Sequence, residues 1–360
     1  MGGKAFSQTL PPESFPRMSH ATYDRLKSLY LHRLRDLYGV VEVPPEDPEK
    51  DDHGDLDYLV AFPRDGLTPA DVKDALGAVE IIFREGNETS HYAIQADEDG
   101  HFVQIDVHAC SGSDMLERIL FYHSYGGIGM MLGRIAKSIS MTLSISTLKI
   151  SQSDPEECHP VSFKLSDNLD DILTFFGLSL DVWRAGFRTR RALFEWLASS
   201  RYFFPARLAT GRVVENSSER RRLTRDIYHA FGDFVDEVAS LQMPLGTDEL
   251  IQSRRSSNKQ IREEALLYFG KKSEYDDVIH ANWVRMRLKT TFTGLKVVEW
   301  TNLWGKKVSE VMKETKRRVG GDDAMARLDE EEVRIWVLRV YEDLRLVWDR
   351  EEAEQSKMTR

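Results

Sequence analysis

The chain has little cysteine, no long apolar run and no excess of positive charge, and each shortage excludes a class of protein. Its 360 residues include 2 cysteines, Cys110 and Cys158, which cannot build a disulfide framework. No apolar run reaches the ~18 residues that a membrane-spanning helix needs, because glycines and charges interrupt the longest candidate, residues 119–150. The first residues lack the basic-then-apolar pattern of a signal peptide. We therefore expect a soluble intracellular protein, cytoplasmic or nuclear, with no membrane segment.

The net charge of −10 argues against a general nucleic-acid-binding protein, but the charge is unevenly distributed. Eleven arginines and only three acids fall between Arg184 and Arg225. Such a basic segment suits a surface that faces phosphate groups. Arginine-rich helices are about as often solvated and paired with acids of their own fold. Both interpretations of this segment stay open.

The first 150 residues show a mixture of helical and strand patterns. A helix is expected over residues 19–38, with Ser19 as its cap and Gly39 as its end. Thr68 followed by Pro69 begins a short helix. Acidic and glycine-containing turns separate strands that we expect over residues 56–62, 78–83, 91–96 and 102–108. The last two of these strands form a hairpin, and a helix with a glycine-rich interruption follows over residues 116–140.

From Leu165 onward the pattern is almost entirely helical. The main candidates are residues 167–176, 189–199, 218–241, 257–270, 308–318 and 330–350. The predicted fold class is α+β, with an N-terminal mixed sheet and flanking helices followed by an all-helical domain. We place the N-terminal domain at residues 1–155, the helical domain at residues 156–350, and a disordered tail at residues 351–360.

Three aspartates carry the functional signal. Asp55 and Asp57 open the first strand, and residues two apart in a strand point to the same face while the apolar residues between them point to the core. Asp106 lies in the middle of a later strand, where an unpaired buried carboxylate is costly. A divalent cation would supply its partner, and we prefer that interpretation to an arginine partner. Three such carboxylates form an all-oxygen site suited to metal-assisted phosphoryl or nucleotidyl transfer.

This pattern of Asp55, Asp57 and Asp106 between apolar residues resembles the nucleotidyltransferase superfamily, the fold of polymerase-beta-like and CCA-adding enzymes. The resemblance covers roughly residues 1–150. It implies transfer of a nucleoside monophosphate from a nucleoside triphosphate such as ATP to an acceptor hydroxyl, with two Mg²⁺ or Mn²⁺ ions as cofactors. Asp55 and Asp57 would bind both ions. Asp106 would bind one ion and help to deprotonate the hydroxyl.

Three further segments resemble a fungal group of the same superfamily that has no assigned substrate. They are residues 2–6, residues 121–133 and residues 175–178. This second resemblance therefore points to one group within the superfamily, but it does not identify the acceptor.

The phosphate-binding part of the pattern departs from the superfamily. Its members carry Gly-Ser or Gly-Gly shortly before the first aspartate, but residues 40–53 contain no such pair. Gly2 and Gly3 are the remaining candidates, with Gly54 beside Asp55. Exposed backbone N–H groups at Gly2 and Gly3 would suit phosphate if that segment folds onto the site, and otherwise the pair is a flexible start.

Two basic residues follow Asp106 on an expected helix. Arg134 and Lys137 are three positions apart and share one helix face. The resemblance implies that they bind the triphosphate, and simple exposure to solvent is the alternative.

The acceptor is open. RNA would fit residues 184–225, where aromatic residues stand among the arginines and both could hold a single strand, but a protein or a small molecule fits equally. The rival to an enzyme is a catalytically inactive member of the fold that binds or regulates a partner. The intact triad favours the enzyme, and the missing glycine pair favours the rival.

Overall fold

A computed structural model of the chain describes residues 5–96, 100–151, 162–209, 226–241 and 247–358. These residues fall into two compact units, one of residues 5–151 with 162–269 and one of residues 270–358. The fold is α+β, as predicted, with an N-terminal mixed sheet and helices followed by a largely helical region. Among the described residues, no helix is long and apolar enough to cross a membrane.

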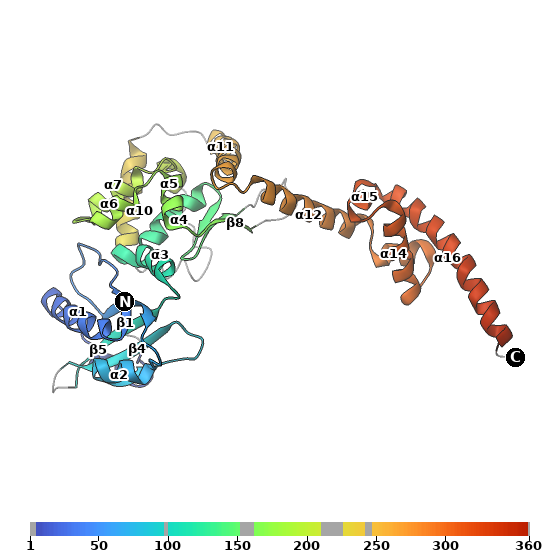
Figure 1. Ribbon diagram of the computed structural model, residues 1–360. Coiled ribbons are helices and arrows are strands. Elements are labelled where there is room, and N and C mark those ends of the chain that lie inside the picture. The colour runs from blue at the N-terminus through green and yellow to red at the C-terminus, as the bar shows by residue number, and fades with distance from the viewer. Residues whose placement is uncertain (1–4, 97–99, 152–161, 210–225, 242–246, 359–360) are drawn as a thin grey trace. The chain divides into compact units, whose positions relative to one another are not determined.

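The first unit is built on a five-stranded sheet in the order β1-β2-β5-β4-β3 (Figure 1). β2 and β5 are parallel, and the other neighbours are antiparallel. All four predicted strands are present, and the hairpin of β4 and β5 is confirmed. The strands are β1 (Tyr38–Glu42), β2 (Asp55–Pro63), β3 (Ala78–Ile82), β4 (Thr89–Gln95) and β5 (Phe102–Ala109).

The first helix ends earlier than predicted. A short turn, η1 (Pro12–Ser14), precedes helix α1 (His20–Arg35). Ser19 caps α1 by accepting a hydrogen bond from the Thr22 N–H, but Asp36 rather than Gly39 ends it. The chain then forms β1, whose Val41 is buried opposite Val60 of β2. Pairing along the sheet edge thus outweighs the helical spacing of these residues.

One face of the sheet is closed by helices. Leu56, Tyr58 and Val60 of β2 are fully buried, as predicted, against α1 and α2 (Pro69–Leu76). Thr68 caps α2 through the Asp71 N–H. On the other face, α3 (Ser113–His123) packs with Leu59 and Ala61 of β2. Because side chains alternate along β2, Asp55 and Asp57 lie on this second face.

Two helices meet at the predicted glycine-rich interruption. α3 is followed by η2 (Ser124–Gly126) and α4 (Ile128–Ser138). Tyr125 holds a left-handed backbone with φ 53°, which is uncommon for a residue other than glycine. A Cβ at Gly129 would lie 2.2 Å from the Tyr122 ring, so only glycine permits this approach. The interruption is therefore a point of close packing between α3 and α4.

A second sheet was not predicted. Its antiparallel strands are β6 (Met141–Leu143), β7 (Leu148–Ser151) and β8 (Ser162–Ser166). The expectation of helices from Leu165 onward is therefore wrong at its first residues, because Phe163 and Leu165 alternate inward in β8. β6 and β7, with three and four residues, are too short to show a clear period in the sequence.

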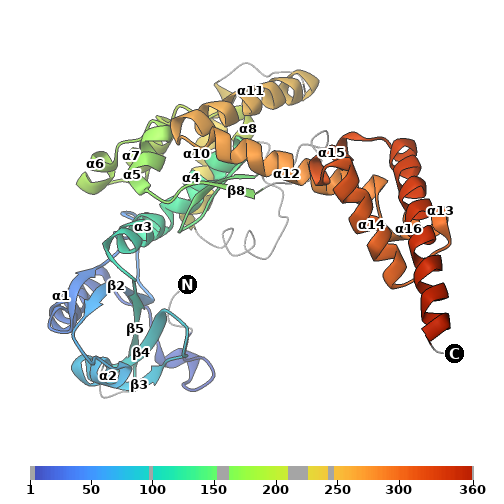
Figure 2. The same ribbon diagram turned by 45° about the vertical axis from the view of Figure 1, so that its right-hand side comes forward.

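Helices make up the rest of the first unit. They form a group apart from the five-stranded sheet in both views (Figure 1, Figure 2). Residues 218–225 of one predicted helix lie outside the described residues, and another begins ten residues earlier than the predicted 257. The helices are α5 (Leu169–Phe176), α6 (Leu180–Ala185), α7 (Arg190–Ala198), α8 (Pro205–Ala209), α10 (Asp226–Ser240) and α11 (Thr247–Tyr268).

The second unit is helical and has its own core. Val297, Val311, Val333 and Val337 are buried together in it. Residues 351–358 belong to its last helix, which corrects the predicted disordered tail over that range. The predicted domain boundary at residue 155 lies outside the described residues and stays a proposal. The helices are α12 (Lys272–Thr291), α13 (Gly294–Thr301), α14 (Lys306–Val319), α15 (Asp322–Arg327) and α16 (Glu330–Met358).

Candidate metal centre

The parallel pairing of β2 with β5 brings the three predicted aspartates together. Asp57 lies directly opposite Asp106 in the register, and Asp55 lies opposite Gln104. One carboxylate oxygen from each aspartate lies within 4.8 Å of the others. Asp55 and Asp106 are partly buried, whereas Asp57 is exposed. The arrangement offers three oxygen ligands on one open face, which suits a hard divalent cation.

Without a cation, the three carboxylates repel one another. Burial and the negative charge of Asp106 raise the pKa of Asp55 to about 6. The pKa of Asp57 is raised in the same direction, by loss of surrounding water and by the charges of Asp55 and Asp106. Because Asp57 is exposed to solvent, we attribute the rise in its pKa mainly to repulsion between the charges. A divalent cation at this point would remove that repulsion, so the residues fit a metal.

Asp106 is held from two sides. His91, opposite it on β4, donates from Nδ1 to Oδ1 at 2.8 Å, and Gln104 donates from Nε2 to the same oxygen at 2.8 Å. The Ala5 N–H in turn donates to Oε1 of Gln104 at 3.0 Å, which fixes the amide orientation. The hydrogen bond that His91 donates to Asp106 raises the pKa of His91. Supporting bonds of this kind are typical of carboxylates that bind metals.

A charged cluster flanks the triad on the loop before β2. Glu46 pairs with Lys50 and accepts a hydrogen bond from the Tyr23 hydroxyl at 3.3 Å. His53 is buried, stacks on the Tyr23 ring with centroids 3.8 Å apart, and places Nδ1 3.6 Å from Glu46. Its burial lowers the pKa of His53. The sequence interpretation missed all of this cluster, since a polar acidic loop carries no periodic signal.

The same loop is fastened to the helical part of the first unit. Arg190, at the start of α7, binds both carboxylate oxygens of Asp47, with Nε–Oδ1 at 2.8 Å and Nη2–Oδ2 at 2.6 Å. Asp47 is only 8% exposed. The Tyr125 N–H donates to the Pro45 carbonyl at 2.5 Å. The loop that flanks the triad is therefore held at both Pro45 and Asp47.

The predicted phosphate-binding residues have different surroundings. Gly54 is buried directly before Asp55. Arg134 donates from Nη2 to the Leu208 carbonyl at 2.8 Å and lies 6.0 Å from the ring centres of Tyr228 and Phe231. Lys137 is exposed near the end of α4. Gly2 and Gly3 lie outside the described residues.

The described arginines of the basic segment are largely engaged within the first unit. Besides the Arg190 pair, Arg184 pairs with Glu117 at 2.5 Å, Arg191 with Glu237 at 3.0 Å, and Arg201 with Glu264. The aromatic residues of the segment mostly serve as core, because Trp183, Phe194 and Trp196 are buried. For these residues the structure matches the interpretation of internal pairing. Arg212, Arg220, Arg221, Arg222 and Arg225 lie outside the described residues.

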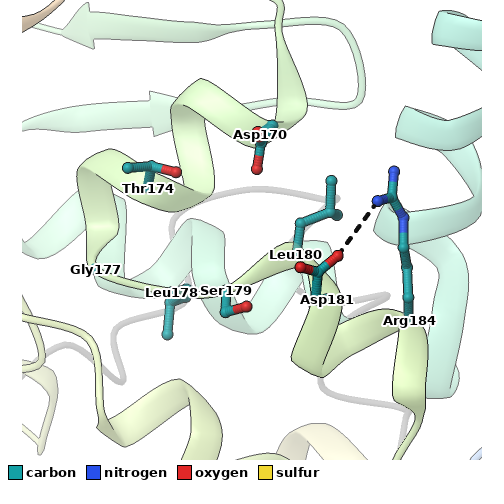
Figure 3. Close-up of a pocket in the computed structure, with 8 residues that line it drawn as sticks. All are labelled: Asp170, Thr174, Gly177, Leu178, Ser179, Leu180, Asp181 and Arg184. Atoms are coloured by element: carbon teal, nitrogen blue, oxygen red, sulfur yellow. Dashed lines mark ion pairs between the residues drawn. The ribbon is translucent and has the colours of Figure 1, made fainter.

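A separate pocket of about 390 Å³ lies at the junction of α5 and α6 (Figure 3). Asp170 and Asp181 give it an acidic lining, and Arg184 at its edge pairs with Asp181 at 3.5 Å. None of the triad residues lines it. We assign it no role in the metal centre.

Comparison with models of known protein families gives no match, and comparison with curated proteins gives none either. The resemblance to nucleotidyltransferases therefore rests on the acidic triad and the mixed sheet that carries it.

Proposed function

We propose that the chain is a metal-dependent nucleotidyltransferase that moves a nucleoside monophosphate from a nucleoside triphosphate to an acceptor hydroxyl. The observation that carries the proposal is the triad, whose carboxylate oxygens lie within 4.8 Å of one another on two parallel strands. Two bound Mg²⁺ or Mn²⁺ ions would stabilise the attacking and leaving oxygens of the displacement. The hydroxyl oxygen would bond to the α-phosphorus while the bond to pyrophosphate breaks.

Each aspartate has a distinct part in this proposal. Asp55 and Asp57 would bind both ions. Asp106 would bind one ion through Oδ2, because His91 and Gln104 both bond to Oδ1. Asp106 would also accept the proton of the attacking hydroxyl. Its two fixed hydrogen bonds would hold the carboxylate in one orientation during that step.

The phosphate contacts belong to the proposal as well. Gly2 and Gly3 remain the predicted source of backbone N–H groups for phosphate, and the first described residue after them, Ala5, is bonded to Gln104. Gly54, Arg134 and Lys137 complete the predicted set.

RNA remains one candidate acceptor. The predicted contact for RNA is the basic segment of residues 184–225, in which Arg184, Arg190 and Arg191 also form internal pairs. A protein or a small-molecule hydroxyl is an equal alternative.

The decisive experiment supplies labelled nucleoside triphosphates, Mg²⁺ or Mn²⁺, and total RNA to the full-length protein. We expect labelled product that disappears, by at least about a thousandfold, in Asp55→Ala and Asp106→Ala, because each removes a ligand of the reacting ions. Asp170→Ala is the matched control, since Asp170 lines the separate acidic pocket. Product that survives in the triad variants would contradict the proposal.

A binding or regulatory protein without catalysis is the second candidate. The loop before β2 favours this candidate. It carries Glu46 and Asp47 in the region where members of the superfamily have the glycine pair whose N–H groups bind phosphate. Absence of turnover with every acceptor, together with partner binding that the Asp55 and Asp106 variants leave unchanged, would select this function.

A further inference from the structure

The charges at the proposed site call for an additional cation. Three ionised carboxylates and a bound triphosphate carry more negative charge than two divalent ions can neutralise. Of the basic residues predicted for this purpose, Arg134 is directed to the Leu208 carbonyl and to the rings of Tyr228 and Phe231. The side chains that flank the triad itself are therefore further candidates for the counter-charge.

Lys50 lies beside the triad on the loop that leads into β2. Its ammonium group pairs with Oε2 of Glu46, the same oxygen lies 3.6 Å from Nδ1 of His53, and His53 precedes Asp55 by two residues. The positive charge of Lys50 accordingly opposes the rise in the pKa of Asp55 and of Asp57. Lys50 is 29% exposed, so its ammonium group is accessible from solvent. Arg17 is held differently, because its Nη2 donates both to a carboxylate oxygen of Asp52 at 2.5 Å and to the carbonyl of Asp52 at 3.0 Å.

Glu46 holds Lys50 in place. Glu46 and Lys50 are four residues apart in the loop before β2. Glu46 in turn accepts a hydrogen bond from the Tyr23 hydroxyl at 3.3 Å. An ion pair that is partly exposed is worth little and exchanges partners readily. A polyphosphate carries more negative charge than one carboxylate, so it would displace Glu46 from the Lys50 ammonium group.

The loop is also prevented from moving away. Asp47 is bound by two guanidinium nitrogens of Arg190, Nε and Nη2, and the Pro45 carbonyl accepts a hydrogen bond from the Tyr125 N–H. Lys50 follows Asp47 by three residues and donates its own N–H to the Asp47 carbonyl at 3.1 Å. The backbone that carries Lys50 is thus fixed before any ligand arrives, which lowers the entropic cost of using it.

We propose that Lys50 is the polyphosphate-binding residue of this site, exchanging Glu46 for the β- and γ-phosphates of the nucleoside triphosphate. The inference rests on the proposed function and places the cation on the loop before the first aspartate, in addition to the predicted Arg134 and Lys137. Glu46 is the competing anion in this exchange.

The test measures two affinities of the full-length protein by titration calorimetry. One is for Mn²⁺ alone, and the other is for the α,β-methylene analogue of ATP with Mn²⁺ present. In Lys50→Met we expect unchanged or slightly tighter Mn²⁺ binding and an analogue affinity lowered about 10- to 100-fold, since a charge-assisted contact is lost. Lys50→Arg should restore most of the affinity. Glu46→Gln should raise it, because a neutral amide in place of the carboxylate cannot compete as an anion.

Lys27→Met is the matched control, because Lys27 carries the same charge and also lies against Tyr23, 5.0 Å from its ring centre. Equal analogue affinities in the Lys50 and Lys27 variants would overturn the inference and leave the proposed function intact. Failure of the analogue or of Mn²⁺ to bind the unaltered protein would overturn the proposed function, and the inference with it. The two failures are therefore distinguishable.

Discussion

At the residue scale, the triad combines a stability cost with a capacity to bind cations. Asp55 and Asp57 were predictable because strand alternation puts both on one face. Asp106 was predictable because a mid-strand carboxylate needs a partner. His91 and Gln104, which orient Asp106, were not predictable, since the register of β4 against β5 is set by pairing across the sheet.

The raised pKa of Asp55 gives the first prediction. Burial and the charge of Asp106 raise its pKa to about 6, so the folded protein binds this proton more tightly than the unfolded chain does. The free energy of unfolding should then fall as the pH rises from about 4 to about 6, and stay reduced above that. In EDTA at pH 7.5, Asp55→Asn should be more stable by about 1–2 kcal/mol in urea unfolding, with little difference at pH 4.

Asp71→Asn is the contrasting variant. Its hydrogen bonds with Thr68 lower the pKa of Asp71, so its removal should destabilise the protein at pH 7.5. Destabilisation by Asp55→Asn at that pH would show that the carboxylate is paired rather than repelled.

At the scale of elements, the loop between β1 and β2 connects the metal centre to the helices. The sequence indicated only a polar acidic loop at residues 44–54. Its fixed shape comes from Arg190, which lies more than a hundred residues away in the chain. Contacts at such separation leave no local pattern, and the same is true of β1, β6 and β7, whose pairing partners define them.

Removal of this clamp gives the second prediction. Arg190→Met should leave the carboxylate of Asp47, which is 8% exposed, without its charged partner and cost roughly 3 kcal/mol of stability. It should also weaken binding of the ATP analogue, since the loop carrying Lys50 loses its support. Urea unfolding and calorimetry measure the two effects.

Arg184→Met is the control, because its pair with Glu117 is exposed and should matter far less. A similar loss of stability in both variants would mean that the Asp47 pair has no special role.

At the scale of the whole molecule, the two compact units have separate cores. The first unit buries Leu56, Tyr58 and Ile105 around its sheet, and the second buries Val333 and Val337 among its helices. Cores that share no residues can unfold separately. The predicted division at residue 155 would instead couple α5 and α7 to the second core.

Hydrogen exchange followed by mass spectrometry tests this division. Val337→Ala should cost about 2 kcal/mol in the second unit and speed exchange in α13, α14 and α16. Exchange in α5 and α7 should stay unchanged, and Mg²⁺ should slow exchange in β2 and β5 alone. Faster exchange in α5 and α7 together with the second unit would favour the boundary at residue 155.

The sequence by itself determined the α+β class, the four strands β2 to β5, the capped helices and the three aspartates. Each of these depends on residues close together in the chain, where periodicity and capping chemistry are visible. Only the tertiary structure decided that Asp57 stands opposite Asp106, that His91 and Gln104 support the same carboxylate, and that Lys50 flanks the triad. These depend on strand register and on a clamp between distant segments, which arise when the chain packs.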